Sequence, residues 1–279
     1  MNPLTKINSR LRRWPLLRRI YFNLFTGRYL WARLSPRASF AQDSEDIKIA
    51  EMLQDVRFFV DIGAYDGITD SNTFLFALRG ARGICFEPVR ETFVKLTALY
   101  RFNRRVICRC CAVSDTTRQG TITKMRGLSC IPETEDRSHS LHYPVLAART
   151  ECEPIQLMTF AEAAASIAIP NPVDLLSIDV EGHELSVLQS IPLERLRFRM
   201  IVIESHLRDR ATNELLWRHR DWDAMNGLLN AHGYHPIWEN WVNTFYAPCP
   251  EADTSLRHEI QAVDYRSVPA GRTTHELCR

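Results

Sequence analysis

Short apolar runs alternate with helical patterns along most of the chain. Five runs are apolar through most of their length, which is typical of strands buried on both faces of a parallel sheet: FFVDIGA, GICFEP, VICRCCAV, VDLLSIDV and RMIVIES. Segments with helical periodicity accompany them, over residues 71–80, 89–100, 161–169, 183–191 and 212–232. This alternation predicts an α/β fold, a doubly wound and mostly parallel sheet with helices on both faces.

The pattern changes at two places. YHPIWEN and VNTFYAP predict a closing antiparallel hairpin, and GTITKM predicts a further short strand. Residues 126–152 show no clear period and are expected to form an irregular insertion. We therefore divide the chain into an arm over 1–42, a single domain over 43–249 and a tail over 250–279.

The composition excludes several classes of protein. With 45% hydrophobic and 24% charged residues, the 279-residue chain is not collagen-like, coiled-coil or largely disordered. No apolar stretch reaches the roughly 18 residues that cross a bilayer. Eight cysteines without a C-x-x-C pair favour buried, reduced thiols over a zinc site or a disulfide framework. A cytoplasmic globular domain is therefore expected.

Charge is distributed unevenly along the chain. Residues 1–42 hold nine cations and no acid, whereas the other 237 residues hold 26 cations against 33 acids. Aromatic and leucine residues lie among the arginines of this arm, and its uncharged runs are too short for a secretory signal. Residues 1–40 are expected to bind an anionic membrane at its cytoplasmic face, or else to form a lid or a dimer contact. A nucleic-acid-binding arm is the third interpretation.

The turn after the first strand carries candidate binding residues. It reads DIGAYDG over residues 61–67, where Gly63 and Gly67 permit a tight turn and a close approach of a ligand. Tyr65 occupies the middle position of a G-x-G-x-x-G motif, and the flanking acids would repel a pyrophosphate. Glu87 closes the second strand, at a distance in sequence where an acid binds the two ribose hydroxyls of an adenosine. An ordinary strand–helix turn is the alternative, but the combination favours a cationic, adenosine-containing ligand.

Several segments together are similar to one known family. FVDIGAYDGITDSNTFLF, GICFEP, CAVSD, VDLLSIDVEGHELSVLQSI and MIVIESH resemble the FkbM family of S-adenosylmethionine-dependent methyltransferases. The resemblance covers about residues 42–247, and IDVEGHE is its most specific part. It implies a Rossmann-like class I methyltransferase sheet of seven strands, the last one antiparallel. It also implies O-methylation of a hydroxyl group in a sugar, glycolipid, polysaccharide or secondary metabolite.

The resemblance also implies a set of residues around S-adenosyl-L-methionine. The glycine turn would line the methionine and ribose end, Glu87 would hold the ribose diol, and Ala112 and Val113 would border the adenine. The complete predicted set is Asp61, Gly63, Ala64, Asp66, Gly67, Glu87, Pro88, Ala112, Val113, Asp115 and Asp179. The chain departs from the family where relatives often have Asn, because Tyr65-Asp66 stands in the turn.

Catalysis requires a group that draws the proton from the acceptor, since a neutral hydroxyl is a poor nucleophile. The candidates after the fourth and fifth strands are Glu181, His183 and His206, with helix capping or structural hydrogen bonds as the alternative roles. Asp179 and Glu204 end neighbouring strands and would suit Mg²⁺ if a metal is used. The resemblance itself requires no metal.

Two other functions are weighed against this one. Methylation of RNA or protein would share the cofactor half of the domain. However, the segment after the fourth strand reads DVEG instead of the Asn/Asp-Pro-Pro-aromatic motif of many amino-group enzymes. The acidic body also offers no track for nucleic acid, so no nucleic-acid partner is expected. A non-catalytic, membrane-associated cofactor-binding protein is the second alternative.

Overall fold

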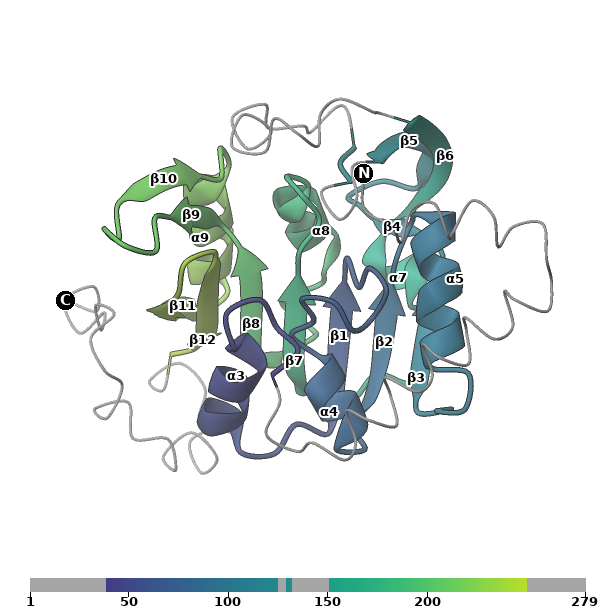
Figure 1. Cartoon of the computed structure of the whole chain (residues 1–279), viewed down its shortest axis with the longest axis horizontal. Coiled ribbons are helices and arrows are strands. Elements are labelled where there is room, and N and C mark those ends of the chain that lie inside the picture. Colours follow the sequence, from purple (N-terminus) through teal and green to yellow (C-terminus); the bar gives the residue numbers. More distant parts are fainter. Residues whose placement is uncertain (1–38, 125–128, 132–150, 250–279) are drawn as a thin grey trace.

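The computed structural model describes residues 39–124, 129–131 and 151–249. A seven-stranded sheet forms its centre, in the order β11-β12-β8-β7-β1-β2-β3 (Figure 1). In chain order the strands are β1 (Phe58–Ile62), β2 (Arg82–Phe86), β3 (Val106–Arg109), β7 (Val173–Ile178), β8 (Phe198–Glu204), β11 (Tyr234–Glu239) and β12 (Asn243–Pro248). The pairs from β3 to β8 are parallel, and β12 is antiparallel to both β8 and β11. The predicted α/β sheet, its closing hairpin and its antiparallel last strand are confirmed.

Helices cover both faces of this sheet (Figure 1). One face carries α3 (Glu45–Leu53), α4 (Phe74–Leu78) and α5 (Arg90–Leu99), and the other carries α7 (Phe160–Ala163), α8 (Glu184–Ser190) and α9 (Trp222–Ala231). Alternate strand residues serve the two cores, since Phe59 and Leu175 pack with the first helices and Val60 and Leu176 with the second. Burial on both sides explains why the strands are apolar through most of their length.

The strand order reverses beside β1. The chain runs from β1 through β2 to β3 on one side and continues with β7 on the other side. The backbone N–H of Asp179, just after β7, donates to the carbonyl of Ile62 at the end of β1 (3.0 Å). Ligands of doubly wound sheets bind beyond the carboxyl ends of the strands at such a reversal.

Two smaller sheets flank the main one. The first contains β4 (Ala112–Val113), β6 (Glu151–Met158) and β5 (Arg118–Lys124) in that order, and the second pairs β9 (His206–Arg208) with β10 (Leu215–Arg218). The prediction that VICRCCAV is one strand is wrong. The chain leaves the main sheet after Arg109, and Ala112 and Val113 pair instead with Leu157 and Met158 of β6.

The expected insertion over 126–152 is shorter than predicted. Glu151 and Cys152 belong to β6 and pair with Lys124 and Thr123 of β5. Thr123 also forms an isolated bridge with Cys130. Residues 125–128 and 132–150 lie outside the described residues, as do 1–38 and 250–279, so the predictions for the arm and the tail stay predictions. None of the described helices is long and apolar enough to span a bilayer.

Two predicted helices are corrected. The alanine-rich segment 161–169 is helical only as far as Ala163, because Ser166 adopts a left-handed backbone conformation (φ 66°) that a helix cannot contain. The segment 212–232 contains β10 followed by α9. Trp217 is buried there while Leu215 and Leu216 are exposed, so pairing with β9 overrides the helical pattern.

Candidate active site

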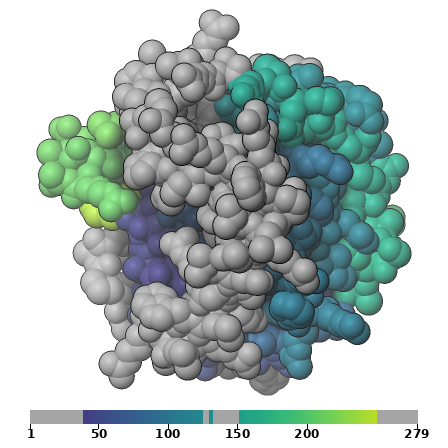
Figure 2. Space-filling model, turned by 45° about the vertical axis from the view of Figure 1, so that its right-hand side comes forward, coloured from purple at the N-terminus to yellow at the C-terminus, as the bar shows by residue number. Residues whose placement is uncertain are grey.

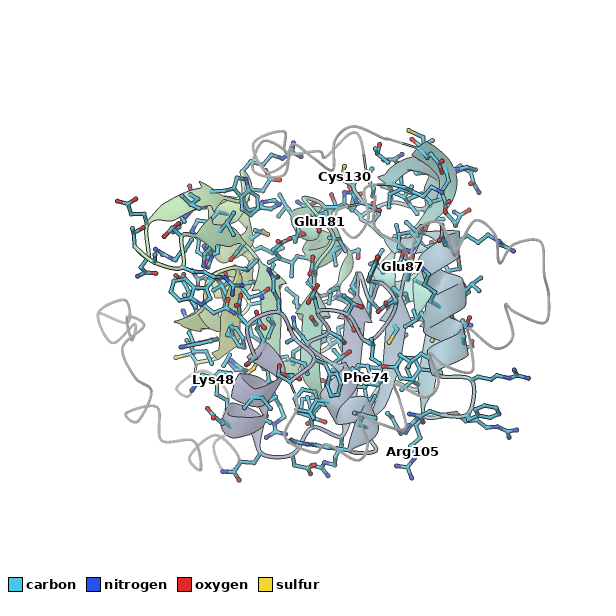
Figure 3. All side chains as sticks on the ribbon, in the orientation of Figure 1. Lys48, Phe74, Glu87, Arg105, Cys130 and Glu181 are labelled. Atoms are coloured by element: carbon cyan, nitrogen blue, oxygen red, sulfur yellow. The ribbon has the colours of Figure 1, made fainter. Side chains whose placement is uncertain are left out.

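A cleft of about 370 Å³ lies at the carboxyl ends of the central strands. The loops after β1, β2 and β7, the end of β8 and the small sheet that contains β5 all contribute to its lining. Figure 3 shows Glu87 and Glu181 at this edge of the sheet, whereas Arg105 lies at the opposite edge. The cleft therefore coincides with the place at which the strand order reverses.

The turn after β1 brings three strand ends together. The N–H groups of Gly63 and Ala64 both donate to the carbonyl of Phe86 at the end of β2 (3.0 Å each). Gly63 has φ +93°, and a Cβ atom there would lie 1.7 Å from the carbonyl oxygen of Asp179. Only glycine permits this contact between the backbones that follow β1 and β7.

We expect Gly63→Ala to destabilise the fold by about 2–5 kcal/mol, which corresponds to a fall of roughly 5–15 °C in Tm, because the added methyl group collides with backbone. Gly227 in α9 is the matched control, since a Cβ there meets nothing within 4 Å. Gly227→Ala should raise stability by about 0.5–1 kcal/mol. Thermal unfolding measures both, and equal Tm values for the two variants would contradict the close approach at Gly63.

Asp66 and Gly67 shape the turn without lining the cleft. The Asp66 carboxylate accepts hydrogen bonds from the N–H groups of Ile68 and Thr69 (3.0 and 2.8 Å). Gly67 has φ +80°, and a Cβ atom there would lie within 3.0 Å of α5 side chains. Both residues therefore help to form the loop, and their contact with a ligand stays a prediction.

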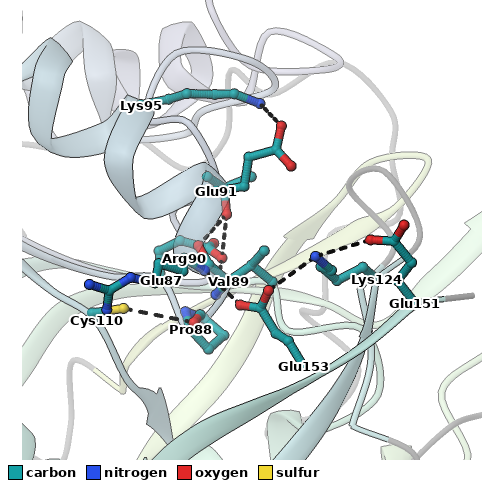
Figure 4. Close-up of polar contacts among 11 residues, drawn as sticks. Glu87, Pro88, Val89, Arg90, Glu91, Lys95, Cys110, Lys124, Glu151 and Glu153 are labelled. Atoms are coloured by element: carbon teal, nitrogen blue, oxygen red, sulfur yellow. Dashed lines mark hydrogen bonds and ion pairs between the residues drawn. The ribbon is translucent and has the colours of Figure 1, made fainter. Parts of the chain in front are cut away.

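Glu87 lies at the end of β2 with its carboxylate held in place. Its Oε1 accepts hydrogen bonds from Val89 N–H and Thr92 Oγ1 (2.7 Å each), and its Oε2 accepts one from Tyr65 N–H (3.0 Å). Figure 4 shows Glu87 beside Val89. Glu87 lines the cleft, and Oε2 has fewer donors than Oε1. A carboxylate oxygen has two lone pairs, so Oε2 can accept a hydroxyl group of a ligand.

Burial dominates the electrostatics of the first two strand ends. It raises the pKa of Glu87 to about 7, although the hydrogen bonds from Thr92, Val89 and Tyr65 act in the opposite direction. It also raises the pKa of Asp61 to about 6, against a hydrogen bond from Thr73 Oγ1 (2.5 Å). Glu87 is therefore close to half protonation near neutral pH, whereas Asp61 is mostly ionised there and takes up its proton about one pH unit lower.

These shifts predict a dependence of stability on pH. A carboxyl group with a raised folded-state pKa binds more protons in the folded than in the unfolded protein, so its ionisation lowers stability as the pH rises. We expect the Tm of the wild-type protein to fall relative to that of Glu87→Gln between about pH 5 and pH 8, because glutamine cannot ionise there. Tm values from scanning calorimetry at several pH values measure this difference. Parallel Tm curves would show that Glu87 has an ordinary pKa.

An apolar wall continues from Glu87. It consists of Phe86, Val89, Ala112, Val113, Ile122 and Ile131. The predicted Ala112 and Val113 and the neighbouring Pro88 line the cleft, but Asp115 does not, and its carboxylate accepts from Ser114 Oγ (3.0 Å). Ile122 and Ile131 were not predicted. Ile122 lies in a recognisable strand, whereas nothing in the pattern around Ile131 indicates that it reaches the cleft.

The β6 strand is tied to the start of α5 beside Glu87. The Glu153 carboxylate accepts the N–H of Arg90 (2.8 Å) and contacts Lys124 Nζ (3.1 Å) (Figure 4). An acidic side chain at this position also interacts favourably with the helix dipole. The small sheet is thereby fixed over the apolar side of the cleft.

Three carboxyl groups gather on the other side. Asp179, Glu181 and Glu204 each present an oxygen within 4.8 Å of the others. Asp179 and Glu204 are hydrogen-bonded to one another, and burial, with the charge of Glu181 and other neighbouring acids, raises the pKa of both well above the usual range. Two buried carboxyl groups that interact in this way titrate as a coupled pair. The predicted metal pair thus lies together, and Glu181 completes a set of oxygen ligands of the kind that hard cations prefer.

The loop that carries Glu181 is held in place by buried side chains of α8 and the segment before α9. The buried Glu184 carboxylate accepts the N–H groups of Val180 (3.1 Å) and Gly182 (3.0 Å), and Glu181 between them has a left-handed backbone (φ 57°). His219 Nε2 lies 2.8 Å from the Glu184 carboxylate. Burial opposes ionisation of Glu184, but His219 and the backbone donors lower its pKa overall. This buried support holds the Glu181 side of the cleft.

The two predicted histidines lie in different surroundings. His183 lines the cleft at the start of α8, and its Nε2 is 3.0 Å from Ser114 Oγ. His206 is buried outside the lining, with Nδ1 2.9 Å from Ser205 Oγ and Nε2 2.8 Å from the Asn240 carbonyl. Both ring nitrogens of His206 are engaged and the side chain does not line the cleft, so its catalytic role stays a prediction that this geometry does not favour.

The charge of the lining is one-sided. Six carboxyl side chains line the cleft, and no Lys or Arg of the described residues does. The six are Asp61, Asp70, Glu87, Asp179, Glu181 and Glu204. Such a lining attracts cations and repels phosphates. A ligand that combines a positive charge, hydroxyl groups and a flat apolar ring matches these surfaces.

Comparison with known proteins adds a family and several structural neighbours. The model of the methyltransferase FkbM domain matches residues 61–236, which is more than half of the chain. No curated protein sequence matches. Among solved structures, precorrin-6y C5,15-methyltransferase from Geobacter metallireducens is 12% identical with a TM-score of 0.41, over 75% of this chain and 89% of that one. Fibrillarin from Aeropyrum pernix, with natively bound S-adenosyl-L-methionine, is 13% identical with a TM-score of 0.40, over 72% and 74%.

Proposed function

The chain belongs to the FkbM methyltransferase family and is an S-adenosylmethionine-dependent methyltransferase, and we propose that it transfers the methyl group to a hydroxyl oxygen. The acceptor that we propose is a sugar, a glycolipid or polysaccharide, or a secondary metabolite. The observation that carries the proposal is the division of the cleft. Glu87 and the apolar wall form one side, and the carboxyl cluster of Asp179, Glu181 and Glu204 forms the other.

The first side fits the cofactor. Glu87 Oε2 can accept a ribose hydroxyl group, and the wall that includes Val89, Ala112 and Ile131 suits an adenine ring. The carboxylates of the lining, Asp61 among them, suit the positive charges of the amino and sulfonium groups. When bound, the cofactor supplies a methyl group on a positively charged sulfur. Residues of the chain then have to position the acceptor oxygen and exclude water.

The second side supports proton removal from the acceptor. Transfer forms an O–CH₃ bond, breaks an S–CH₃ bond and releases the hydroxyl proton. We propose that Glu181 takes up this proton, because its carboxylate lies beside the hydrogen-bonded pair of Asp179 and Glu204. The raised pKa values of Asp179 and Glu204 reduce the negative charge beside Glu181, and a carboxylate in this position suits general-base catalysis. His183 lines the same cleft and is the second candidate.

Mg²⁺ at the carboxyl cluster would give these residues a different role. Asp179, Glu181 and Glu204 would then be ligands, and the metal would lower the pKa of the acceptor hydroxyl. Transfer rates with EDTA and with added Mg²⁺ distinguish the two roles. Rates unaffected by EDTA favour proton transfer to Glu181, whereas loss on chelation and recovery with Mg²⁺ favours the metal.

The acceptor class is tested with labelled S-adenosylmethionine and a panel of acceptors. We expect label in sugars, glycolipids or hydroxylated metabolites and none in protein. We also expect none in RNA, because the acid-lined cleft repels phosphates. Acid-stable and alkali-stable label at oxygen identifies an ether product. Transfer only to RNA or protein would overturn the acceptor class, and cofactor binding without transfer to any acceptor would favour a non-catalytic role.

A further inference from the structure

The edge of the sheet opposite the cleft is formed by the amino ends of β1, β2 and β3. We call residues 55–57, 79–82 and 100–105 the amino edge. Backbone hydrogen bonds join its segments, since Arg82 N–H donates to the Arg57 carbonyl (2.8 Å) and Gly83 N–H to the Arg105 carbonyl (3.0 Å). Six arginines belong to this edge: Arg57, Arg79, Arg82, Arg101, Arg104 and Arg105.

These arginines are largely without acidic partners. Arg57 contacts Asp55, which is the single acid of the amino edge (3.2 Å). Within the described part of the chain, no carboxylate oxygen lies within 4.0 Å of the other five guanidinium groups. Arg105 instead donates to the neutral carbonyl of Gly80 (2.8 Å). With six arginines and one acid, the amino edge carries a net charge of +5.

An exposed aromatic side chain lies in the middle of this charge. Phe102, in the turn between α5 and β3, is 79% exposed, more than the other exposed large hydrophobics of the described residues, Leu215 and Leu216 (43% and 46%). The Arg101 guanidinium lies 5.4 Å from the centre of its ring. In Figure 2, atoms in the blue of residues near 100 project at the lower right. A single exposed aromatic side chain is ordinary by itself, and its position among arginines is what distinguishes Phe102.

The two edges of the sheet have opposite charge. Six carboxyl groups line the cleft at one edge, and unpaired arginines occupy the other (Figure 3). A charge distribution of this kind orients a protein before contact with a charged surface. An anionic surface attracts the amino edge and repels the edge that contains the cleft.

We propose that the amino edge docks on an anionic lipid bilayer. The arginines contact the lipid phosphates, each cation near the surface adding to the attraction. Phe102 enters the interfacial region, where aromatic side chains are favoured. This docking surface consists of described residues alone and is separate from the membrane contact predicted for the N-terminal arm.

Two features favour a bilayer over a nucleic acid. The arginines belong to turns at three neighbouring strand ends and therefore follow one edge of the domain. None of them lines the cleft, which could otherwise hold a nucleic-acid strand. Among the exposed large hydrophobics of the described ranges, Phe102 is the single aromatic, whereas single-strand binding surfaces stack successive bases on several aromatic rings. Docking through this edge leaves the cleft facing the aqueous phase. The acceptor group must then reach the cleft from the solution side, which favours a soluble acceptor or a long polar chain over a lipid headgroup.

Co-sedimentation of the full-length protein with vesicles tests the proposal. The vesicles contain phosphatidylcholine alone or a mixture with phosphatidylglycerol, in low and high salt. The variants are Phe102→Ser and the double variant Arg101→Gln/Arg104→Gln. Controls are Leu216→Ser, which removes another exposed large hydrophobic side chain, and the double variant Arg118→Gln/Arg220→Gln, which removes the same charge elsewhere. The N-terminal arm is present in every protein and contributes equally.

We expect wild-type binding to mixed vesicles only, weakened by salt. The double arginine variant should bind roughly 10-fold more weakly and Phe102→Ser several-fold more weakly, with both controls close to wild type. Unchanged Tm values and transfer rates show that the variants remain folded. Equal binding by all proteins would overturn the proposal, and so would tighter binding to a single-stranded RNA oligonucleotide than to mixed vesicles.

Discussion

Glu87→Ala is expected to weaken S-adenosylmethionine binding by roughly 10- to 150-fold, the loss that corresponds to about 1.5–3 kcal/mol for hydrogen bonds to a charged acceptor. Glu87 lies at the end of β2 and lines the cleft, and its Oε2 accepts one backbone hydrogen bond. Removal of the carboxylate leaves the ribose hydroxyl groups without their proposed partner. Titration calorimetry with the cofactor and with S-adenosylhomocysteine measures the effect.

Two further variants separate binding from folding. Glu87→Gln keeps one oxygen, which can accept from Val89 or from Tyr65 but not from both, and it removes the charge. Its affinity should therefore lie between those of wild type and Glu87→Ala. Glu91→Ala is the control, because Glu91 lies nearby on α5 and pairs with Lys95 (3.7 Å) (Figure 4). An affinity of Glu87→Ala within twofold of wild type would remove Glu87 from the cofactor site.

The pKa of Glu87 adds a second readout to the same experiment. Burial raises this pKa to about 7, so a fraction of the carboxyl groups is protonated at neutral pH. Since the ionised form is the stronger acceptor, wild-type affinity should increase as the pH rises through 7, and the affinity of Glu87→Gln should not. Parallel pH profiles would show that ionisation of Glu87 does not contribute to binding.

Glu181→Gln is expected to lower the rate of methyl transfer by about 10²–10⁴-fold, with cofactor affinity close to wild type. The amide retains the size of the side chain but cannot take the acceptor proton. The supporting bonds from Glu184 to Val180 and Gly182 involve backbone groups, so the loop should keep its conformation. Steady-state transfer kinetics and calorimetry measure the two quantities separately.

The transfer rates of variants at neighbouring residues identify the group that takes the proton. Glu194→Gln is the control, because Glu194 is exposed and does not line the cleft. If Glu181→Gln has a wild-type rate and His183→Ala does not, His183 is the base. Wild-type rates in both variants would leave Asp179 or Glu204 as the remaining proton acceptors in the cluster.

The sequence alone predicts the centre of the domain because long-range packing and local pattern agree there. Strands such as VDLLSIDV are buried on both faces, so their apolar character identifies them without knowledge of their neighbours. DIGAYDG and GICFEP each contain a special local feature, a glycine at positive φ and an acid at a strand end. The positions of Gly63 and Glu87 in the cleft follow from the order of the strands.

Predictions from local pattern were wrong where distant pairing decides the structure. The segment around Trp217 has a helical pattern, but pairing with β9 makes it a strand. Ala112 and Val113 follow β3 directly in sequence, yet they pair with β6, more than forty residues later. The strand β6 in turn places the small sheet, and with it Ile122, beside the cleft.

The sequence by itself therefore determined the α/β sheet, the glycine turn, the acid at the end of β2 and the carboxylates after β7 and β8. Only the tertiary structure decided which of these side chains face the same space. His206 follows β8 as expected, but Ser205 and Asn240 occupy both of its ring nitrogens, and Asp66 is used within its own turn. Glu181 lies beside Asp179 and Glu204 because its own backbone is left-handed, in a loop that the buried Glu184 holds in place. Side-chain direction depends on contacts between residues far apart in the chain, and those contacts exist only after the strands have paired.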